Sequence, residues 1–435
     1  PPMRVVAWDG VFKATQFGPA CPQVSRFNLT DASSNEDCLS INVTIPANIS
    51  KDEVLPVLFW IHGGAFIGGS SNLYRLDRLA NYGRMIIVTA NYRLGFLGFA
   101  ALPSPRSSSI NGNYGIEDQR EAMRWIKRNI SLFGGDPNNI TIAGESAGAA
   151  SICMHLGSPF EVTDLFHKAI LISAGCLANA KGISDGIEIS KIMSSKDYLD
   201  CPNTDNLVAC LRAKDVSEIL NAQTKFTNQY PQDLSPFMPL HGTPEVPNKT
   251  IPTSLIDALS EKNGGAFKAI PTLIGGEQKE MLLYVTYWWQ DAVSNKGEKL
   301  DNESIRSFWL PMFYGDNSKK IISQYGLEER NLTAENLGTF LSDFNPTIGI
   351  NNCLYYYGAN KIKAYPKSKA LYLFEFADPN APVNGIGIPK PYPYYELGPV
   401  HSAIINYLFP NFSNNKKMDA PELNQNSGKL SSQII

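Results

Sequence analysis

Ser146 lies in a pattern of residues typical of a catalytic nucleophile. The sequence GESAG at 144–148 follows a β-branched run at 140–143 and precedes small residues at 149–151. A strand that turns sharply into a helix through G-x-S-x-G exposes the serine Oγ at the end of a sheet, and the glycines keep the turn free of bulk. The helix N-terminus would favour negative charge developing beside Ser146. Since the pattern also occurs by chance in loops, the prediction depends on finding oxyanion donors, an acid and a histidine elsewhere.

Two glycines after another apolar run could supply the oxyanion donors. The sequence HGGAF at 62–66 directly follows the continuous apolar run at 55–61. Alone, it indicates only a tight turn from a strand into a loop. Together with G-x-S-x-G, it predicts that the N–H groups of Gly63 and Gly64, joined by that of Ala147, bind the oxygen of a tetrahedral intermediate. Loss of one such donor typically costs ~3 kcal/mol of transition-state stabilisation.

The elements that must position these groups alternate between short apolar runs and segments with helical spacing. Besides a strand that follows the loop starting at residue 36, strands are expected at 55–61, 85–90, 140–143, 167–173, 269–276 and 370–376, and a helix at 117–130. This alternation predicts a mainly parallel sheet with helices on both faces. Because no repeat or low-complexity linker divides the chain, residues 1–435 are predicted to form a single α/β domain with insertions.

The composition gives little reason to expect a large partner. The 435 residues are 43% hydrophobic and 18% charged, with a formal net charge of −3, as in ordinary globular proteins. A charge this small does not predict binding to nucleic acid or to an anionic membrane. No apolar run reaches the ~18 residues that a membrane span needs, so no transmembrane segment is expected.

Two pairs of cysteines could close small disulfide loops. Cys21 and Cys38 flank one polar loop, and Cys201 and Cys210 flank another. Their spacing fits no zinc site. The other three cysteines lie in apolar surroundings and are expected to be buried thiols: Cys153, Cys176 and Cys353.

Nine N-x-[ST] sequons accompany these cysteines. They begin at Asn28, Asn42, Asn48, Asn129, Asn139, Asn248, Asn302, Asn331 and Asn411. Together with two disulfides, they favour an oxidising compartment and a secreted glycoprotein, outside the cell or in the ER lumen.

The two glycine-containing motifs resemble those of the type-B carboxylesterase/lipase family, which includes the cholinesterases. Further matches cover almost the whole chain: WDG at 8–10, ATQFGPACPQ at 14–23, EDCL at 36–39, NYR at 91–93, G-x-x-DQ at 115–119 and FGGDP at 133–137. The resemblance implies an α/β-hydrolase fold and hydrolysis of carboxylic esters by a serine, an acid and a histidine. It also implies that Cys21 pairs with Cys38.

The family's acid is a glutamate in a G-x-x-x-x-E-G context after a strand. Gly275 and the five residues after it fit this context, so the resemblance implies Glu280 as the acid. Met281 departs from the family pattern, in which glycine is usual. Glu277 therefore remains the alternative acid, and either glutamate could instead be a solvated charge on a loop.

The family's histidine lies in a late G-x-x-H motif, which residues 398–401 match. His401 is the only histidine after the acid, and it gives the chain order Ser, Glu, His of this fold. Ser402 replaces the usual next glycine, as in the fungal lipases of the family. Of the other four histidines, His62 is interpreted as part of the oxyanion loop, and His155 and His167 as structural residues. His241 has no assigned role.

These residues predict a two-step mechanism. His401 would take the proton of Ser146 during attack and return it to the leaving alcohol. Glu280 would fix the imidazole tautomer and stabilise the imidazolium without taking a proton. Water would then hydrolyse the acyl-enzyme, with no metal or organic cofactor. Activity should fall below pH ~6–7 as His401 becomes protonated.

The loop at 22–37 bears on the substrate. The resemblance implies that a cholinesterase carries a tryptophan there, but Phe27 is its only aromatic residue, so a cation–π site for choline is missing. The loop is also short for a lipase lid, which favours a soluble apolar ester over emulsified fat. The alternatives are a triacylglycerol lipase and a non-catalytic adhesion protein, although the latter would lack a triad residue. The aromatic residues expected near the site are Phe66, Phe96, Trp288, Trp289, Tyr392, Tyr394 and Tyr395.

The ends of the sequence also differ from the family pattern. Family members begin with a short strand before WDG and continue past residues 429–435 into a closing helix. This chain is therefore expected to be incomplete at both termini.

Overall fold

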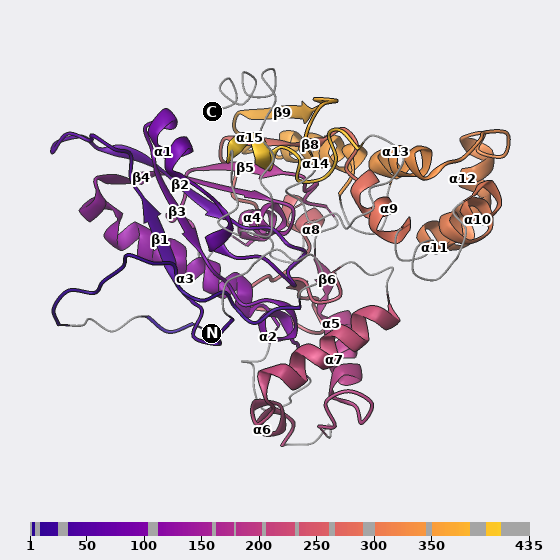
Figure 1. The fold of residues 1–435 in the computed structure, drawn as a ribbon, viewed down its shortest axis with the longest axis horizontal. Coiled ribbons are helices and arrows are strands. Elements are labelled where there is room, and N and C mark those ends of the chain that lie inside the picture. The colour runs from indigo at the N-terminus through magenta and orange to yellow at the C-terminus, as the bar shows by residue number, and fades with distance from the viewer. Residues whose placement is uncertain are drawn as a thin grey trace.

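A seven-stranded sheet forms the centre of the molecule in a computed structural model (Figure 1). The structure describes residues 2–4, 9–24, 34–102, 112–158, 162–177, 180–201, 206–230, 235–260, 266–289, 301–344, 350–382 and 397–409. The strand order is β1-β3-β2-β4-β5-β8-β9. The bounds are β1 Ile41–Thr44, β2 Leu55–Ile61, β3 Ile86–Ala90, β4 Gly135–Glu145, β5 Lys168–Ile172, β8 Thr272–Glu277 and β9 Leu371–Phe376. Strand β1 is antiparallel to β3, and every other neighbouring pair in this sheet is parallel.

Strand β2 shows why its sequence is apolar throughout. Val57, Phe59 and Ile61 belong to the apolar core on one side of the sheet, whereas Leu58 and Trp60 belong to the core on the other side. Successive side chains of a strand point to opposite faces, so a strand covered on both faces has no polar positions to alternate with. The continuous apolar run therefore predicted both the strand and its central place.

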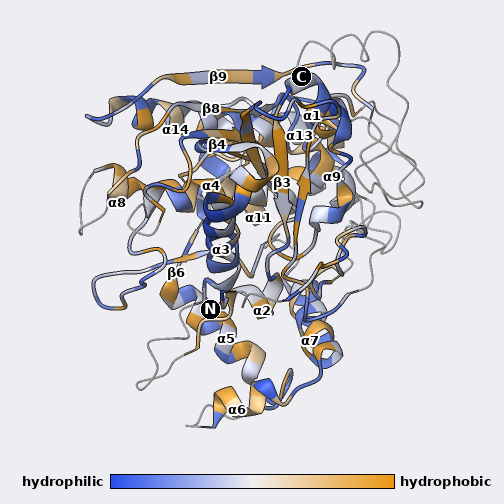
Figure 2. Ribbon diagram, turned by 90° about the vertical axis from the view of Figure 1, so that its left-hand side faces the viewer, coloured by the Kyte–Doolittle hydropathy of each residue, from blue (hydrophilic) through white to orange (hydrophobic). Residues whose placement is uncertain are grey.

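Helices cover both faces of the sheet. Figure 2 shows apolar residues gathered in the central strands and polar residues on the outward side of α3. The bounds are α1 Asp77–Gly83, α2 Gly95–Phe99, α3 Tyr114–Asn129, α4 Ala147–Gly157, α5 Ile183–Ser194, α6 Leu207–Arg212, α7 Val216–Gln229, α8 Leu255–Leu259, α14 Asn352–Ala364 and α15 Ile405–Leu408. A small parallel pair, β6 Lys181–Gly182 and β7 Leu240–His241, lies apart from the main sheet. Within the described ranges, every helix is too short or too polar to cross a bilayer.

A second apolar core lies beside the sheet. We call it the helical region, comprising Met281 and the helices α9 Leu282–Trp289, α10 Asn302–Ser304, α11 Leu310–Tyr314, α12 Ser318–Gln324 and α13 Ala334–Phe344. Figure 1 shows it in orange tones, extending from one end of the sheet. Aromatic rings form its centre, where the ring centroids of Trp288 and Phe313 are 4.8 Å apart.

The predicted strands at 55–61, 85–90, 140–143, 167–173, 269–276 and 370–376 all correspond to strands of the sheet. Two differences concern their ends. Strand β4 begins at Gly135, five residues before the predicted run, because the turn at 134–137 already pairs with the start of β2. The strand predicted after residue 36 begins only at Ile41.

Three disulfides are present. Cys21–Cys38 and Cys201–Cys210 confirm the pairs expected from the sequence. The expectation that Cys153 and Cys176 are thiols is wrong, because they form the third disulfide. Helix α4 packs back along β5, which brings two cysteines 23 residues apart to a Cα–Cα distance of 5.2 Å. Cys353 is indeed a free thiol, but it is exposed at the start of α14 rather than buried.

Candidate active site

Ser146 lies at a strained turn between β4 and α4. Its backbone has φ 56° and ψ −122°, a conformation that residues with a Cβ rarely adopt. The Ser146 N–H donates to the carbonyl of Ile172 at the end of β5, at 2.9 Å. The turn is therefore held by the neighbouring strand, as a nucleophile elbow requires.

The glycines on either side of Ser146 are required by close packing of the backbone. A Cβ on Gly148 would lie 2.0 Å from the carbonyl oxygen of Ile61. A Cβ on Gly144 would lie 2.7 Å from the carbonyl carbon of Gly148. Real Cβ atoms do not approach backbone this closely, so both ends of the G-x-S-x-G pattern have a steric cause.

The loop after β2 passes directly beside this turn. A Cβ on Gly63 would lie 2.7 Å from Glu145 Oε2 and 3.2 Å from the Cβ of Ser146. Gly64 has φ 109°, which favours glycine, and Ala147 is the first residue of α4. Of the three predicted oxyanion donors, Gly63 and Ala147 therefore lie directly beside Ser146, and Gly64 follows Gly63 in the chain.

His62 and Tyr92 support the start of this loop. The Tyr92 hydroxyl donates to the carbonyl of His62 at 2.9 Å, and the two rings are stacked with centroids 4.3 Å apart. Burial lowers the pKa of His62 to about 4, so its imidazole is neutral near pH 7. These contacts fix the backbone that leads into Gly63.

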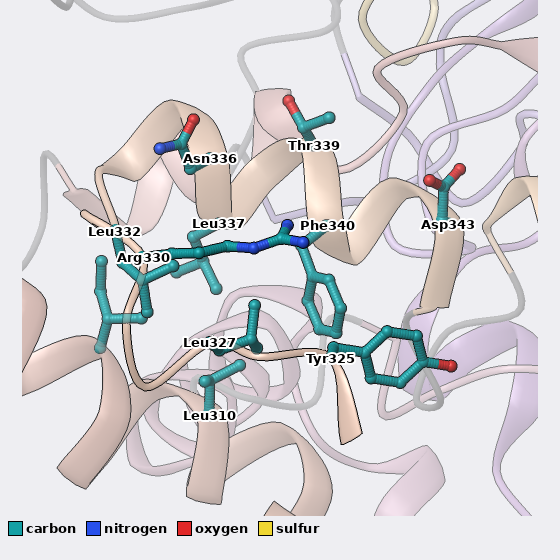
Figure 3. A pocket seen from close by; sticks show the side chains of 11 residues that line it. Leu310, Tyr325, Leu327, Arg330, Leu332, Asn336, Leu337, Thr339, Phe340 and Asp343 are labelled. Atoms are coloured by element: carbon teal, nitrogen blue, oxygen red, sulfur yellow. The ribbon is translucent and has the colours of Figure 1, made fainter. Parts of the chain in front are cut away.

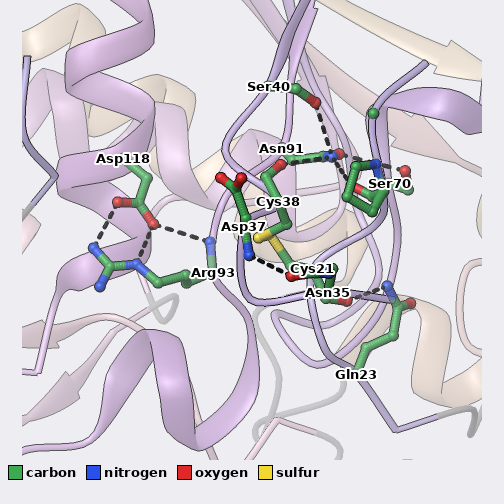
Figure 4. The surroundings of a disulfide bond; sticks show 12 residues. Cys21, Gln23, Asn35, Asp37, Cys38, Ser40, Ser70, Asn91, Arg93 and Asp118 are labelled. Atoms are coloured by element: carbon green, nitrogen blue, oxygen red, sulfur yellow. Dashed lines mark hydrogen bonds and ion pairs between the residues drawn. A yellow bond between two sulfur atoms is a disulfide. The ribbon is translucent and has the colours of Figure 1, made fainter. Parts of the chain in front are cut away.

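The Cys21–Cys38 disulfide anchors the far side of the loop (Figure 4). The side chain of Asn91 donates to the carbonyl of Cys38 at 3.1 Å and accepts from the N–H of Ser71 at 2.9 Å. Gln23 bonds both backbone polar groups of Gly69, at 2.9 and 3.0 Å. Asn91, Gln23 and the disulfide therefore hold the loop after β2 in place.

Glu280 and His401 form a buried pair. His401 Nδ1 lies 2.6 Å from Glu280 Oε2, and the two residues are 3% and 0% exposed. The N–H of Lys279 donates to the carbonyl of Pro399 at 3.0 Å, which joins the two turns that carry them. The Tyr355 hydroxyl donates to the other Glu280 oxygen at 2.8 Å. Of the two glutamates considered from the sequence, Glu280 is thus the one that contacts His401.

Glu277 lies next to this pair but has other hydrogen-bond partners. It ends β8, is fully buried, and accepts the hydroxyl of Ser173 and the N–H of Ile404, the latter at 3.3 Å. Burial raises its pKa well above the usual range, and the charge of Glu280 raises it further. Neither Glu277 nor Glu280 is a solvated charge on a loop.

The second nitrogen of His401 faces a third glutamate. His401 Nε2 lies 3.2 Å from Glu145 Oε1, and the Ser402 hydroxyl donates to the same oxygen at 2.6 Å. Burial raises the pKa of Glu145 to about 7, against the opposing effect of His401. Between the described residues Ser146 and His401, the structure shows no hydrogen bond. The structure instead places the histidine between two carboxylates, Glu145 and Glu280.

Tyr284 is a site residue that the sequence analysis missed. It lies in the first turn of α9 and is buried, with its ring centroid 5.3 Å from that of His401. Burial raises the pKa of Tyr284 well above its usual range, and the neighbouring Ser146 side chain acts in the opposite direction. A usable signal was its position four residues after Glu280, one helical turn beyond the acid.

Few of the predicted aromatic lining residues are placed at the site. Phe66 and Phe96 are buried among other rings, with Phe99 and Phe237 respectively at 5.2 and 5.9 Å between centroids. Trp288 belongs to the core of the helical region. The other candidates fall outside the described part of the structure: the side chain of Trp289, and Tyr392, Tyr394 and Tyr395. Residues 25–33 of the loop expected to choose the substrate also fall outside it.

The remaining histidines have structural contacts. His155 is buried on α4 and bonds Gln119 at 2.9 Å, while the His167 ring accepts the N–H of Ile140 at 3.1 Å. Both agree with the structural roles predicted for them. His241 lies in β7, far along the chain from the site residues, with its ring beside its neighbour's carbonyl.

One group of side chains has the composition of a metal site. The ligand atoms of Glu277, Glu280 and His401 lie within 4.8 Å of one another. However, each of the four carboxylate oxygens already has a donor within the protein, from Ser173, Ile404, Tyr355 or His401. The group is therefore satisfied as a hydrogen-bond network.

A surface pocket lies elsewhere, in the helical region (Figure 3). Its volume is about 350 Å³, and its lining includes Leu310, Leu327, Phe340 and the side chain of Arg330. None of the candidate site residues lines it. The pocket and the nucleophile thus belong to different parts of the molecule.

Comparisons with known proteins agree with this geometry. A family model described as "Carboxylesterase family" matches residues 1–435. The para-nitrobenzyl esterase of Bacillus subtilis is 36% identical over 288 residues, which are 64% of this chain and 55% of that protein. Gut esterase 1 of Caenorhabditis briggsae is 36% identical over 334 residues, which are 73% of this chain and 56% of that protein. The chain thus spans a little over half the length of these relatives.

Solved structures of related esterases have the same fold as this chain. A thermophilic para-nitrobenzyl esterase matches with a TM-score of 0.74 and 27% identity, over 98% of this chain and 80% of the other. A second para-nitrobenzyl esterase structure matches with a TM-score of 0.72 and 26% identity, over 98% and 79%. The fold is therefore that of these α/β-hydrolases.

Proposed function

The chain belongs to the carboxylesterase family, and from this premise we propose that it hydrolyses carboxylic esters, with Ser146 as nucleophile, His401 as base and Glu280 as acid. The observation that carries the proposal is the buried 2.6 Å contact between His401 and Glu280, beside the strained turn of Ser146. A carboxylate at this distance favours the tautomer whose free nitrogen can accept the serine proton.

The reaction begins when His401 Nε2 exchanges Glu145 for the hydroxyl of Ser146. As Ser146 Oγ attacks the ester carbonyl, its proton passes to His401, and Glu280 stabilises the imidazolium without taking the proton. The N–H groups of Gly63, Gly64 and Ala147 bind the oxyanion. They are preorganised by the packing of the loop against the elbow, so binding the developing charge requires little rearrangement.

Collapse of the tetrahedral intermediate breaks the bond to the alcohol. His401 gives the alcohol its proton, and an acyl ester on Ser146 remains. In the second half, His401 takes a proton from water, hydroxide adds to the acyl carbon, and the acid leaves as Ser146 regains its proton. The cycle consumes one water and needs no cofactor.

The proposed substrate is an uncharged ester with an apolar acyl group. Tyr284 places a neutral aromatic ring beside Ser146, and its pKa keeps the phenol uncharged. Two relatives are named as esterases, a para-nitrobenzyl esterase and a gut esterase. The loop at 22–37 also favours a soluble ester, since it is short for a lipase lid.

The protein is also proposed to be secreted or to reside in the ER lumen as a glycoprotein. Three disulfides support an oxidising compartment. Asn48 and Asn331 are exposed and suit N-linked sugars, whereas Asn248 is 3% exposed and its side chain accepts two backbone N–H groups. Asn248 is therefore excluded as an acceptor in the folded protein, although it lies in a sequon.

Hydrolysis of p-nitrophenyl butyrate by wild type and by Ser146→Ala tests the function. We expect kcat to fall roughly 10⁶-fold in the variant, as when the nucleophile of a serine triad is removed. Ser260→Ala changes an exposed serine after α8 and serves as the matched control. Equal rates for wild type and Ser146→Ala would show that Ser146 is not the nucleophile. A wild type inactive on soluble esters but active on a long-chain emulsion would favour a lipase.

A further inference from the structure

Three glutamates surround His401, and the mechanism above uses only two of them. Glu145 and Glu280 contact its two ring nitrogens, whereas Glu277 contacts Ser173 and the N–H of Ile404. Glu277 is nevertheless fully buried and lies three residues before Glu280, to which its own N–H donates at 2.9 Å. A carboxyl group this deeply buried is costly unless its charge or its hydrogen bonds are satisfied, so its protonation state matters for Glu280.

The charges in this cluster do not balance if every glutamate is ionised. The titratable groups that face Glu277 are Glu280 from the turn after β8, His401 from the turn before α15, Glu145 from β4, and Tyr355 from α14. Within the described part of the chain, no lysine or arginine pairs with any of the three glutamates. A buried carboxylate without a cation is costly, so at least one of these groups must hold a proton.

The hydrogen bonds place that proton on Glu277. A carboxyl oxygen of Glu277 and one of Glu280 lie within 4.8 Å of each other, and two buried carboxylates this close favour a proton on one of them. Burial raises the pKa of both groups, but the interaction between them raises the pKa of Glu277 further and lowers that of Glu280. Glu280 also accepts from Tyr355 and from a backbone N–H, contacts that favour its ionised form. These contacts favour the proton on Glu277 and the negative charge on Glu280.

We propose that Glu277 is a positioning residue for the hydrolysis: as a neutral acid, it donates a hydrogen bond to the Glu280 carboxylate and holds it against His401. This inference rests on the proposed function. It gives a role to the glutamate that the sequence left as an alternative acid. The role needs the hydrogen-bonding shape of a carboxylic acid but not a charge, because a second negative charge here would repel Glu280.

The amide of glutamine is the natural test of this role. In Glu277→Gln, an N–H can still donate to Glu280, while the amide oxygen can accept from Ser173 and Ile404. In Glu277→Leu, all these bonds are lost. We expect Glu277→Leu to lower kcat/KM by roughly 10- to 100-fold, as for loss of a hydrogen bond to a charged group, and Glu277→Gln to restore most of it. The acid limb of the pH profile should lie at the same pH in wild type and Glu277→Gln.

Infrared difference spectroscopy gives a readout that does not depend on activity. The spectrum of wild type minus Glu277→Gln should show the carbonyl stretch of a protonated carboxylic acid at neutral pH. Glu328→Gln, which changes an exposed glutamate, is the matched control and should show only the bands of a carboxylate. Absence of the acid band in the first difference would overturn the proposal, even if Glu277→Leu failed to fold.

The kinetic outcomes separate the remaining explanations. An acid limb moved to lower pH in Glu277→Gln would mean that Glu277 carries a charge that stabilises the imidazolium, and would overturn the proposal. A loss in Glu277→Gln as large as in Glu280→Gln would make Glu277 part of the triad and overturn it equally. Failure of the proposed function looks different, because hydrolysis by wild type would then not depend on Ser146.

Discussion

The carboxyl edge of the sheet, which carries Glu145, Glu280 and His401, and the helical region are stabilised by different interactions. At the edge, the polar groups of the site are paired at short distances, such as His401 with Glu280 at 2.6 Å and Ser402 with Glu145 at 2.6 Å. The helical region is held mainly by apolar rings and carries a surface pocket of about 350 Å³. Hydrogen bonds fix geometry, whereas apolar packing tolerates changes of shape. If the proposed function holds, we expect the edge to perform the chemistry and the helical region, which contributes Tyr284, to affect the choice of substrate.

The two regions meet at the first residues after the acid. The N–H of Met281 donates to the hydroxyl of Ser342 on α13 at 2.9 Å, and its side chain is fully buried in the helical core. Tyr284, one turn later, reaches Ser146. Met281, where the family pattern has glycine, therefore attaches the turn of the acid to the helical region.

The largest effect is expected from a change at the edge. Glu280→Gln should lower kcat by roughly 10⁴-fold, because the amide can hold His401 in the wrong tautomer and cannot stabilise the imidazolium. The loss should be equal for short and long acyl esters, since the edge performs the same steps on both. Steady-state kinetics on p-nitrophenyl acetate and octanoate measure this. A loss that differs between acetate and octanoate would mean that the edge also selects the acyl group, which would contradict the expected division between the edge and the helical region.

A smaller effect should follow from removing the Cys153–Cys176 disulfide, which links the helix after Ser146 to the loop after β5. The Cys153–Cys176 disulfide ties α4 to the loop after β5, whereas no cysteine occurs at 281–344. Changing both cysteines to serine should lower the free energy of unfolding by about 3 kcal/mol, from the loop it closes. Hydrogen exchange should then show α4 losing protection toward the level of the helical region. Cys353→Ser is the matched control and should leave both unchanged.

Tyr284→Phe tests whether Tyr284 acts with the edge or with the helical region. The change removes one hydroxyl beside Ser146 and keeps the ring, so kcat/KM should change by less than roughly 10-fold, the size of one neutral hydrogen bond. The ratio of kcat/KM for octanoate to that for acetate should change, because Tyr284 belongs to the helical region. If both esters change by the same factor, Tyr284 acts with the edge instead.

The smallest effect concerns stability and pH. Burial raises the pKa of Glu145 from 4.5 in the unfolded chain to about 7 in the folded one. Such a group contributes its stability fully below pH 4.5, and this contribution is lost as pH rises toward 7, because the folded state holds a proton that the unfolded state releases. Urea midpoints at pH 5 and pH 7.5 should therefore fall less in Glu145→Gln than in wild type. A larger fall in the variant would contradict the shift.

The sequence was most informative where burial and backbone geometry leave a local pattern. Strand β2 was visible as an apolar run because both of its faces are covered, and Ser146 was visible because its turn excludes side chains at Gly144 and Gly148. Glu280 was the preferred acid despite Met281, and the structure gives it the contact with His401.

Other features depend on how distant segments pack. The partner of Cys153 is 23 residues away, and both cysteines have apolar neighbours that suggest a thiol equally well. The position of His401 Nε2 beside Glu145 depends on contacts between residues more than 250 positions apart. Tyr284 looked like another apolar residue in LLYVTYWW, since its role arises only from the side chain that it meets.

The free thiol on α14 offers a built-in attachment point for a reporter. Six of the seven cysteines are tied up in disulfides, so a maleimide fluorophore would label Cys353 without any engineered residue. Cys353 stands two residues before Tyr355, whose hydroxyl holds the acid. Emission from that dye during turnover would therefore follow, in real time, the helix that supports Glu280.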